Sequence, residues 1–123
     1  MATAARKPRV LYLEGAPAPY RVEFWNVLGN YCDLTVWCQA AYEKGRTWEI
    51  EGLAENFAYE VLPGWRIGED KYLNPGIGTK LAREPFDAHM MSLNSSPTEI
   101  LAMRWFRRRG IPFIWKSDGG FPR

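Results

Sequence analysis

Seven residues suited to binding a sugar or a phosphate occur in three short segments, each soon after an apolar run. They are Gly15, Tyr20, Arg21, Asn94, Ser95, Ser117 and Asp118. Arginine offers a forked cation to a phosphate, and tyrosine offers a ring face and a hydroxyl. Asparagine and serine both donate and accept hydrogen bonds, as sugar hydroxyls require. These residue types predict a sugar- or phosphate-binding crevice, with the first six residues as ligand contacts and Asp118 as the candidate catalytic residue.

Two of these segments also have a structural interpretation. Tyr20 and Arg21 begin a helix, and a helix start has polar groups of its own to satisfy, so both side chains can simply pack there. Asp118 precedes two glycines. It suits a turn as well as it suits an acid, a base or an acceptor for a sugar hydroxyl. The sequence leaves both alternatives open.

The three segments are embedded in an alternation of strand and helix patterns. Short apolar or alternating runs predict strands over 10–13, 34–38, 57–62, 86–93 and 113–116. Helical spacing and turn signals predict helices over 20–31, 74–83 and 97–109. The segments without a period are 39–56 and 65–72. The last helix has the strongest signals, because Ser96 and Glu99 form an expected capping box, Pro97 occupies its first position and Gly110 follows its end.

This alternation predicts one Rossmann-like α/β domain over residues 1–123. We expect an open parallel sheet of about five strands in the order 3-2-1-4-5, with helices on both faces. The topological switch point then lies between strands 1 and 4, where such sheets bind ligands. Gly15–Arg21 and Asn94–Ser96 would face one crevice, with Ser117–Gly120 on its flank.

The composition is that of an ordinary globular domain. With 46% hydrophobic and 24% charged residues, the chain of 123 residues indicates neither disorder nor a membrane span. A formal net charge of +2 is too small to indicate a nucleic-acid partner. Cys32 and Cys38 match neither a zinc site nor a redox pair, so we expect two reduced core residues in a cytosolic protein. No signal-peptide stretch follows Arg6 and Lys7.

Two further features have both a functional and a structural interpretation. His89, the only histidine, lies in the middle of an expected strand, where packing or exposure is commoner than catalysis. Four arginines lie near the end of the last helix: Arg104, Arg107, Arg108 and Arg109. They suit a solvated helix end that complements the macrodipole, and they also suit peripheral binding to anionic lipid. Nucleic acid is the least favoured partner, because no recognised binding motif accompanies them.

Five segments of the chain share their pattern with a known family. They are Arg9-Val-Leu-Tyr-Leu, Ala16-Pro-Ala-Pro-Tyr-Arg-Val-Glu-Phe-Trp, Cys32-Asp-Leu-Thr-Val, Leu73-Asn-Pro-Gly and Ile111-Pro-Phe-Ile-Trp-Lys-Ser-Asp-Gly. Together they resemble the amino-terminal domain of retaining glycosyltransferases of the GT-B fold, in the fourth sequence family. The likeness runs from about Pro8 to Gly119, and its most specific part is Pro17-x-Pro19-Tyr20-Arg21.

The resemblance implies a domain that binds the sugar acceptor and faces a carboxyl-terminal domain that holds the nucleotide-sugar donor. It implies no metal and no other cofactor. By position it places Gly15 near the donor phosphates, Tyr20 and Arg21 near the acceptor or the domain cleft, and Ser117 and Asp118 at the catalytic end of the last strand. The donor domain is missing from these 123 residues, so we expect the isolated chain to be inactive.

Two functional classes follow from the resemblance. The first is the acceptor-binding half of a cytoplasmic glycosyltransferase that acts on a glycan or a lipid-linked acceptor, with contact to the inner face of the membrane. The second is a non-catalytic subunit or interaction module of a split glycosyltransferase. A reading frame continuing past Arg123 would favour the first, and a separate donor-domain gene the second. In either class, the edge of the strand over 113–116 predicts self-association.

Overall fold

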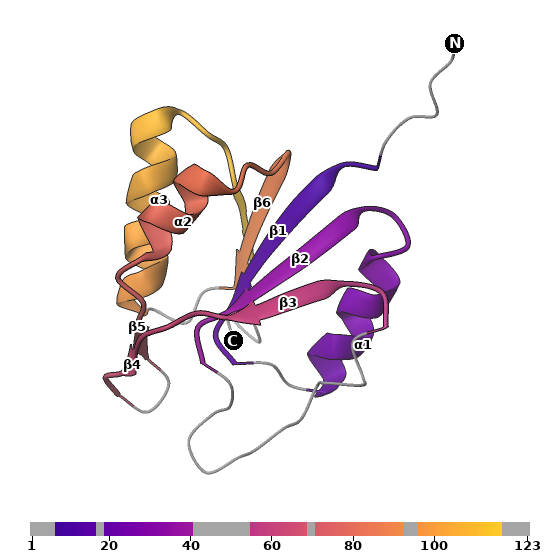
Figure 1. The fold of residues 1–123 in the computed structure, drawn as a ribbon, viewed down its shortest axis with the longest axis horizontal. Helices are drawn as coiled ribbons and strands as arrows, with labels where there is room; N and C mark the ends of the chain where they lie inside the picture. The colour runs from indigo at the N-terminus through magenta and orange to yellow at the C-terminus, as the bar shows by residue number, and fades with distance from the viewer. Residues whose placement is uncertain (1–6, 17–18, 41–54, 69–70, 93–95, 117–123) are drawn as a thin grey trace, which may run out of the picture.

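The computed structural model describes residues 7–16, 19–40, 55–68, 71–92 and 96–116, and its centre is an open sheet of five parallel strands (Figure 1). The strands are β1 Arg9–Glu14, β2 Asp33–Cys38, β3 Ala58–Val61, β6 Ala88–Ser92 and β7 Ile114–Lys116. Their order across the sheet is β3-β2-β1-β6-β7. These are the five strands that the sequence predicts, in the predicted order 3-2-1-4-5. The Rossmann-like α/β fold is therefore confirmed.

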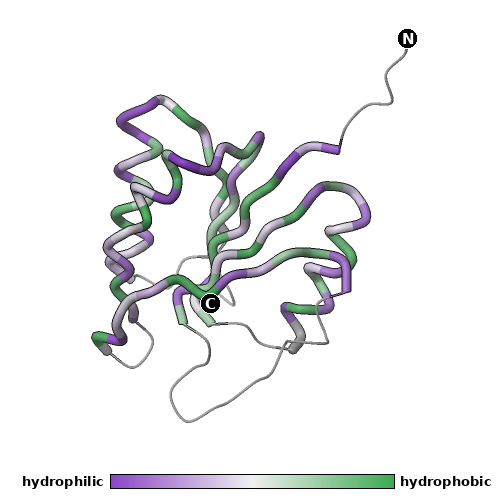
Figure 2. Tube along the Cα trace, viewed as in Figure 1, coloured by the Kyte–Doolittle hydropathy of each residue, from purple (hydrophilic) through white to green (hydrophobic). Residues whose placement is uncertain are grey.

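Helices cover both faces of this sheet. Helix α1, Pro19–Leu28, lies on one face, which we call the α1 face (Figure 1). Helices α2, Ile77–Arg83, and α3, Pro97–Arg109, lie together on the opposite face, which we call the α2/α3 face. Figure 2 shows hydrophobic and hydrophilic residues alternating along α1 and α3, as expected of helices with one side against a sheet.

Strand β1 supplies side chains to both faces because successive residues of a strand point to opposite sides. Val10 and Tyr12 belong to the core of the α1 face, and Leu11 and Leu13 belong to the core of the α2/α3 face. The other buried members of the first core are Val22, Trp25, Cys32, Leu34, Val36 and Cys38. The other buried members of the second are Trp37, Leu62, Ile77, Leu81, Met91, Ala102 and Phe106. A near-continuous apolar run is thus explained by burial on two sides.

The two cysteines lie in the α1 core as free, buried thiols, as the sequence predicts. Burial raises the pKa of both Cys32 and Cys38, and the nearby carboxylates of Asp33 and Glu14 respectively raise it further. Both groups therefore remain protonated, uncharged thiols at neutral pH, which suits an apolar core.

Three expected boundaries are wrong. Two strands lie where an irregular segment is expected, since β4, Trp65–Arg66, pairs antiparallel with β5, Tyr72–Leu73. Helix α2 begins at Ile77 instead of at Asn74-Pro75. Asn74 has tertiary partners instead, because its backbone N–H donates to the Thr98 hydroxyl. Its side-chain amide also lies within hydrogen-bond distance of three carbonyls. Helix α1 ends at Leu28, three residues before the expected end.

The limits of α3 confirm the sequence prediction, but its capping box does not form. Pro97 occupies the first turn, and Gly110 takes the left-handed conformation with φ of 65° that a C-cap glycine adopts readily. The Ser96 hydroxyl instead accepts a hydrogen bond from the backbone N–H of Tyr72 at 3.1 Å. The Glu99 carboxylate accepts one from the side chain of Gln39 at 3.0 Å. The side chains of Ser96 and Glu99 therefore bond to residues far away in the sequence, Tyr72 and Gln39, instead of capping the helix.

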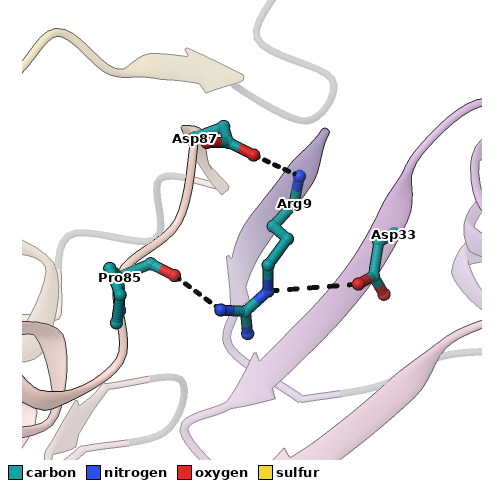
Figure 3. A network of polar contacts seen from close by, with 4 residues as sticks. All are labelled: Arg9, Asp33, Pro85 and Asp87. Carbon is teal, nitrogen blue, oxygen red and sulfur yellow. Dashed lines mark hydrogen bonds and ion pairs between the residues drawn. The ribbon is translucent and has the colours of Figure 1, made fainter. Parts of the chain in front are cut away.

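At the amino edge of the sheet, where the strands begin, Arg9 contacts three other parts of the chain (Figure 3). Its backbone N–H donates to the Asp87 carboxylate at 2.7 Å, and its guanidinium donates to the carbonyl of Pro85 at 2.9 Å. The same guanidinium lies 3.9 Å from the Asp33 carboxylate and stacks on the ring of Phe86 at 4.8 Å. These contacts join the starts of β1, β2 and β6, so the amino edge has a structural role.

Candidate functional site

Three of the predicted ligand contacts, Gly15, Tyr20 and Arg21, belong to the described residues, and they lie at the carboxyl edge of the sheet. Gly15 directly follows β1 and is buried, and its carbonyl accepts a hydrogen bond from the backbone N–H of Ala40 at 2.9 Å. Arg21 lies in the first turn of α1, one residue after Tyr20. The remaining candidates, Asn94, Ser95, Ser117 and Asp118, fall outside the described residues.

The strand order places the switch point where the sequence predicts it. Strand β1 pairs with β6 in parallel, with Leu13 opposite Met91, so the chain leaves both strands at the same edge. Strand β1 also pairs with β2 on its other side. Ser92, the last residue of β6, marks where the predicted segment from Asn94 begins. The crevice of an open α/β sheet is expected between two such strands.

A buried ion pair lies under this edge on the α1 face. The Arg21 guanidinium is 3.1 Å from the Glu14 carboxylate, and their side chains are 5% and 7% exposed. Burial removes water from both charges, which is tolerated only when they neutralise each other at close range. Arg21 thus joins the end of β1 to the start of α1. This geometry corresponds to the packing alternative for Arg21, and its contact with a ligand stays a prediction.

Two buried hydroxyl groups extend this polar network from β1 to the neighbouring strand β6. Tyr12 and Ser92 lie 2.9 Å apart through their oxygens, which connects β1 to β6, and the Arg21 guanidinium lies 3.5 Å from the Tyr12 hydroxyl. Tyr12 and Ser92 are fully buried. Four side chains are thus linked in series: Glu14, Arg21, Tyr12 and Ser92. We call these four residues the polar floor, because they lie beneath the switch point. They hold the ends of β1 and β6 in place.

Three members of this floor, Tyr12, Glu14 and Ser92, are not predicted from the sequence. One signal was present, because Glu14 interrupts an otherwise apolar strand at its last position and Arg21 follows seven residues later. A charge at the end of a buried strand needs a partner. The pairing of Tyr12 with Ser92 depends on the register of β1 against β6, which no local pattern specifies.

A second polar cluster lies at the same edge on the α2/α3 face. Asn74 is its centre, since its backbone N–H donates to the Thr98 hydroxyl at 2.6 Å and its amide lies 3.1 to 3.2 Å from the carbonyls of Gln39, Leu62 and Pro63. Asn74 is only 1% exposed, and Gln39, Leu62 and Thr98 are also buried, whereas Pro63 is exposed. The cluster joins the ends of β2 and β3 to the start of α3.

Glu99 places a buried carboxylate at the start of α3, where the positive end of the helix macrodipole favours an anion. The side-chain amide of Gln39 donates to it at 3.0 Å. Within the described part of the chain, no group of three His, Cys, Asp or Glu side chains is arranged to hold a metal ion. The described side chains at this edge offer amides, hydroxyls and carboxylates, which form hydrogen bonds and carry charge.

His89 lies away from this edge, in the apolar layer of the α2/α3 face. Its ring packs on Phe106 and Phe86, with centroids 4.7 Å and 6.1 Å apart. Burial lowers its pKa, so the ring is neutral at pH 7. The packed interpretation of the only histidine is confirmed.

The four arginines of α3 are exposed, as the solvated interpretation requires. Arg109 stacks on the ring of Trp105 at 4.4 Å. Arg104, Arg108 and Arg109 line a hollow of about 360 Å³ between α2 and α3, together with Leu101 and Trp105. No helix in the described residues is long and apolar enough to cross a membrane.

Comparisons with protein-family models, with curated proteins and with solved structures found no match to this chain.

Proposed function

We propose that this chain is the acceptor-binding half of a glycosyltransferase, which transfers a sugar from a nucleotide-sugar donor to a glycan or a lipid-linked acceptor. The proposal starts from the five segments between about Pro8 and Gly119 that resemble the amino-terminal domains of GT-B enzymes. In this proposal the donor is held by a second domain or subunit, and no metal or other cofactor takes part.

The observation that carries the proposal is the junction of β1 and β6 at the carboxyl edge. The segment of highest resemblance, Pro17-x-Pro19-Tyr20-Arg21, comes soon after β1 in the sequence, and its last three residues begin α1. The register of β1 against β6 brings Gly15 and Ser92 to the same edge of the sheet. Ligands of open α/β sheets bind at such junctions. The polar floor below it holds both strand ends in fixed positions, which favours binding.

The roles follow the sequence predictions. Gly15 lets the donor phosphates approach the backbone, and Tyr20, Asn94, Ser95 and Ser117 contact acceptor hydroxyls. Arg21 contacts an acceptor phosphate where the acceptor is lipid-linked. Asp118 is the candidate acid, base or hydroxyl acceptor at the end of the last strand.

A two-part experiment tests this function on the purified 123-residue chain. Nuclear magnetic resonance titrations with methyl glycosides of glucose, mannose, galactose and N-acetylglucosamine should shift the backbone amides of Gly15 and Ser92 in a saturable way. Calorimetry with UDP-glucose and GDP-mannose should show no binding, and mixtures of donor and glycoside should show no sugar transfer. Tight nucleotide-sugar binding, transfer by this chain alone, or unmoved amides at both positions would refute the proposal.

The exposed face of α3 supports contact with an anionic membrane surface. Ile100 and Leu101 are 50% and 38% exposed, and the arginines that follow are solvated. Such a helix lies in the headgroup region, with apolar side chains inserted and guanidinium groups on lipid phosphates. We expect the chain to sediment with vesicles of phosphatidylglycerol and to stay in solution with vesicles of phosphatidylcholine. Replacing Arg104 and Arg108 by serine should abolish the sedimentation, and equal sedimentation with both lipids would contradict the assignment.

The second candidate function, a non-catalytic subunit or interaction module, is favoured by the outer edge of the sheet. Strand β7 is the last strand in the described sheet, and Ile114 and Trp115 on it are 60% and 57% exposed. Exposed sheet edges recruit further strands. Sedimentation velocity should then show association that Ile114→Lys reduces. A strict monomer with slowly exchanging amides from Phe113 to Lys116 would exclude this edge as an interface.

A further inference from the structure

A small polar hollow lies beside the β4–β5 hairpin, next to the carboxyl ends of β2 and β3. Its volume is about 230 Å³, and its lining includes Gln39, Gly64, Trp65, Arg66 and Tyr72. None of these residues belongs to the polar floor at the switch point. The hairpin itself is the element that the sequence patterns do not predict.

Trp65 presents an aromatic ring to solvent at the rim of this hollow. Its side chain is 63% exposed, although a large apolar ring is usually buried. The neighbouring Arg66 guanidinium lies 5.5 Å from the centre of the Tyr72 ring, which holds its position at the hollow. An exposed indole beside a guanidinium offers a flat apolar surface and hydrogen-bond donors together.

The hairpin is held in place by the Asn74 cluster. A Cβ atom on Gly64 would overlap the carbonyl of Leu73 and the amide of Asn74, so only glycine allows this close approach. The Asn74 amide lies 3.1 Å from the carbonyl of Pro63, directly before Gly64, and the backbone N–H of Tyr72 donates to Ser96 at 3.1 Å. A ligand therefore meets a preformed surface, which reduces the entropy lost on binding.

Gln39 also lines the hollow. Its side chain is 3% exposed, and its Nε2 donates to the Glu99 carboxylate at 3.0 Å, which fixes the amide orientation. Its Oε1 is buried without a hydrogen-bond donor among the described residues. A buried acceptor left unpaired costs stability. A ligand in the hollow would lie beside this residue, so the side-chain amide of Gln39 reports on its binding.

We infer that this hollow is a subsite for one pyranose ring. The C–H face of the sugar stacks on the Trp65 indole, and the Arg66 guanidinium donates to one of the sugar oxygens. Small-molecule sites combine apolar ring surface with a few fixed polar groups in this way. The inference deepens the proposed function and rests on it, because it makes the bound ring a further unit of the sugar acceptor.

The experiment follows the Trp65 indole N–H and the Gln39 side-chain amide during titration with the same four methyl glycosides. At least one glycoside should shift both signals in a saturable way in the millimolar range. Trp65→Ala should weaken that binding about fivefold or more, and Trp65→Phe should retain most of it. Trp115→Ala is the matched control, because Trp115 is similarly exposed at 57% and lies on β7. It should leave the affinity unchanged.

The outcomes separate this subsite from the proposed function. Saturable shifts at Gly15 and Ser92 without any at Trp65 would overturn the subsite and leave the acceptor crevice supported. Shifts at Trp65 and Gln39 alone would support a sugar-binding surface and remove support for the crevice. Equal weakening by Trp65→Ala and Trp115→Ala would overturn the subsite, because the effect would not be specific to the hollow.

Discussion

The two faces of the sheet bury polar groups in different ways. The α1 face contains an ion pair, Glu14 with Arg21, whose charges lie 3.1 Å apart inside the protein. The α2/α3 face has a neutral amide, Asn74, at the centre of its cluster, and a histidine that burial keeps uncharged. A charge pair fixes two elements strongly, but each charge depends on the other. An amide can satisfy several backbone groups at once.

This difference matches what each face connects. On the α1 face the ion pair joins the end of β1 to the start of α1, and the contact between Tyr12 and Ser92 joins β1 to β6. On the other face the ends of β2 and β3, the β4–β5 hairpin and the start of α3 meet at one point. We therefore expect that losing one member of the ion pair lowers the free energy of unfolding more than losing the Asn74 amide does.

The largest expected effect is that of Arg21→Met. The substitution leaves the Glu14 carboxylate buried without its cation, and breaking a buried pair costs about 3–5 kcal/mol of unfolding free energy. Urea denaturation of the purified chain measures the loss. The double variant Glu14→Leu/Arg21→Met removes both charges and should recover most of the stability. If the single variant unfolds like the wild type and loses affinity for a phosphate-bearing acceptor, Arg21 is a ligand contact and the comparison fails.

A smaller effect is expected from Asn74→Ala. The change leaves the backbone carbonyls of the cluster without their donor, which costs about 2–3 kcal/mol for buried acceptors. Asn56→Ala is the matched control, because its amide also donates twice, to the Asn26 carbonyl at 3.0 Å and to Asn30 at 2.7 Å, but at an exposed site. It should cost less than about 1 kcal/mol. Equal losses in urea denaturation would show that burial does not decide the contribution of the amide.

The fold was predictable because its signals are local. The apolar run of β1, the alternation in β3 and the Pro97 and Gly110 signals around α3 each mark an element within a few residues. Five strands with helices between them then allow few topologies, and right-handed crossovers select among them. The sequence predicted both the strand order and the position of the switch point.

The predictions failed where tertiary partners compete with local ones. Ser96 and Glu99 have the spacing of a capping box, yet each bonds to a residue more than twenty positions away, Tyr72 and Gln39 respectively. The Asn74-Pro75 pattern predicts a helix start, but the side-chain amide of Asn74 lies within hydrogen-bond distance of three carbonyls outside α2. The Tyr12–Ser92 contact likewise depends on strand register. Long-range pairing of this kind cannot be read from one stretch of sequence.

The smallest expected effect is the pH dependence contributed by His89. Burial lowers its pKa in the folded chain below the value of about 6.5 expected in the unfolded chain. The unfolded state therefore binds more protons below that value, and linkage makes the folded state lose stability as the pH falls. Between about pH 7.5 and 5.5 ordinary carboxylates stay ionised, so His89 should dominate the change.

Urea midpoints measured across this interval should fall for the wild type and stay nearly level for His89→Leu and for His89→Gln. Leucine replaces the ring by an apolar side chain beside Phe106, and glutamine keeps a polar group that does not titrate. Two variants with different polarity separate the proton effect from changes in packing. A parallel fall in all three proteins would assign the pH dependence to other groups. It would also remove the uncharged histidine from the contrast between the α1 face and the α2/α3 face.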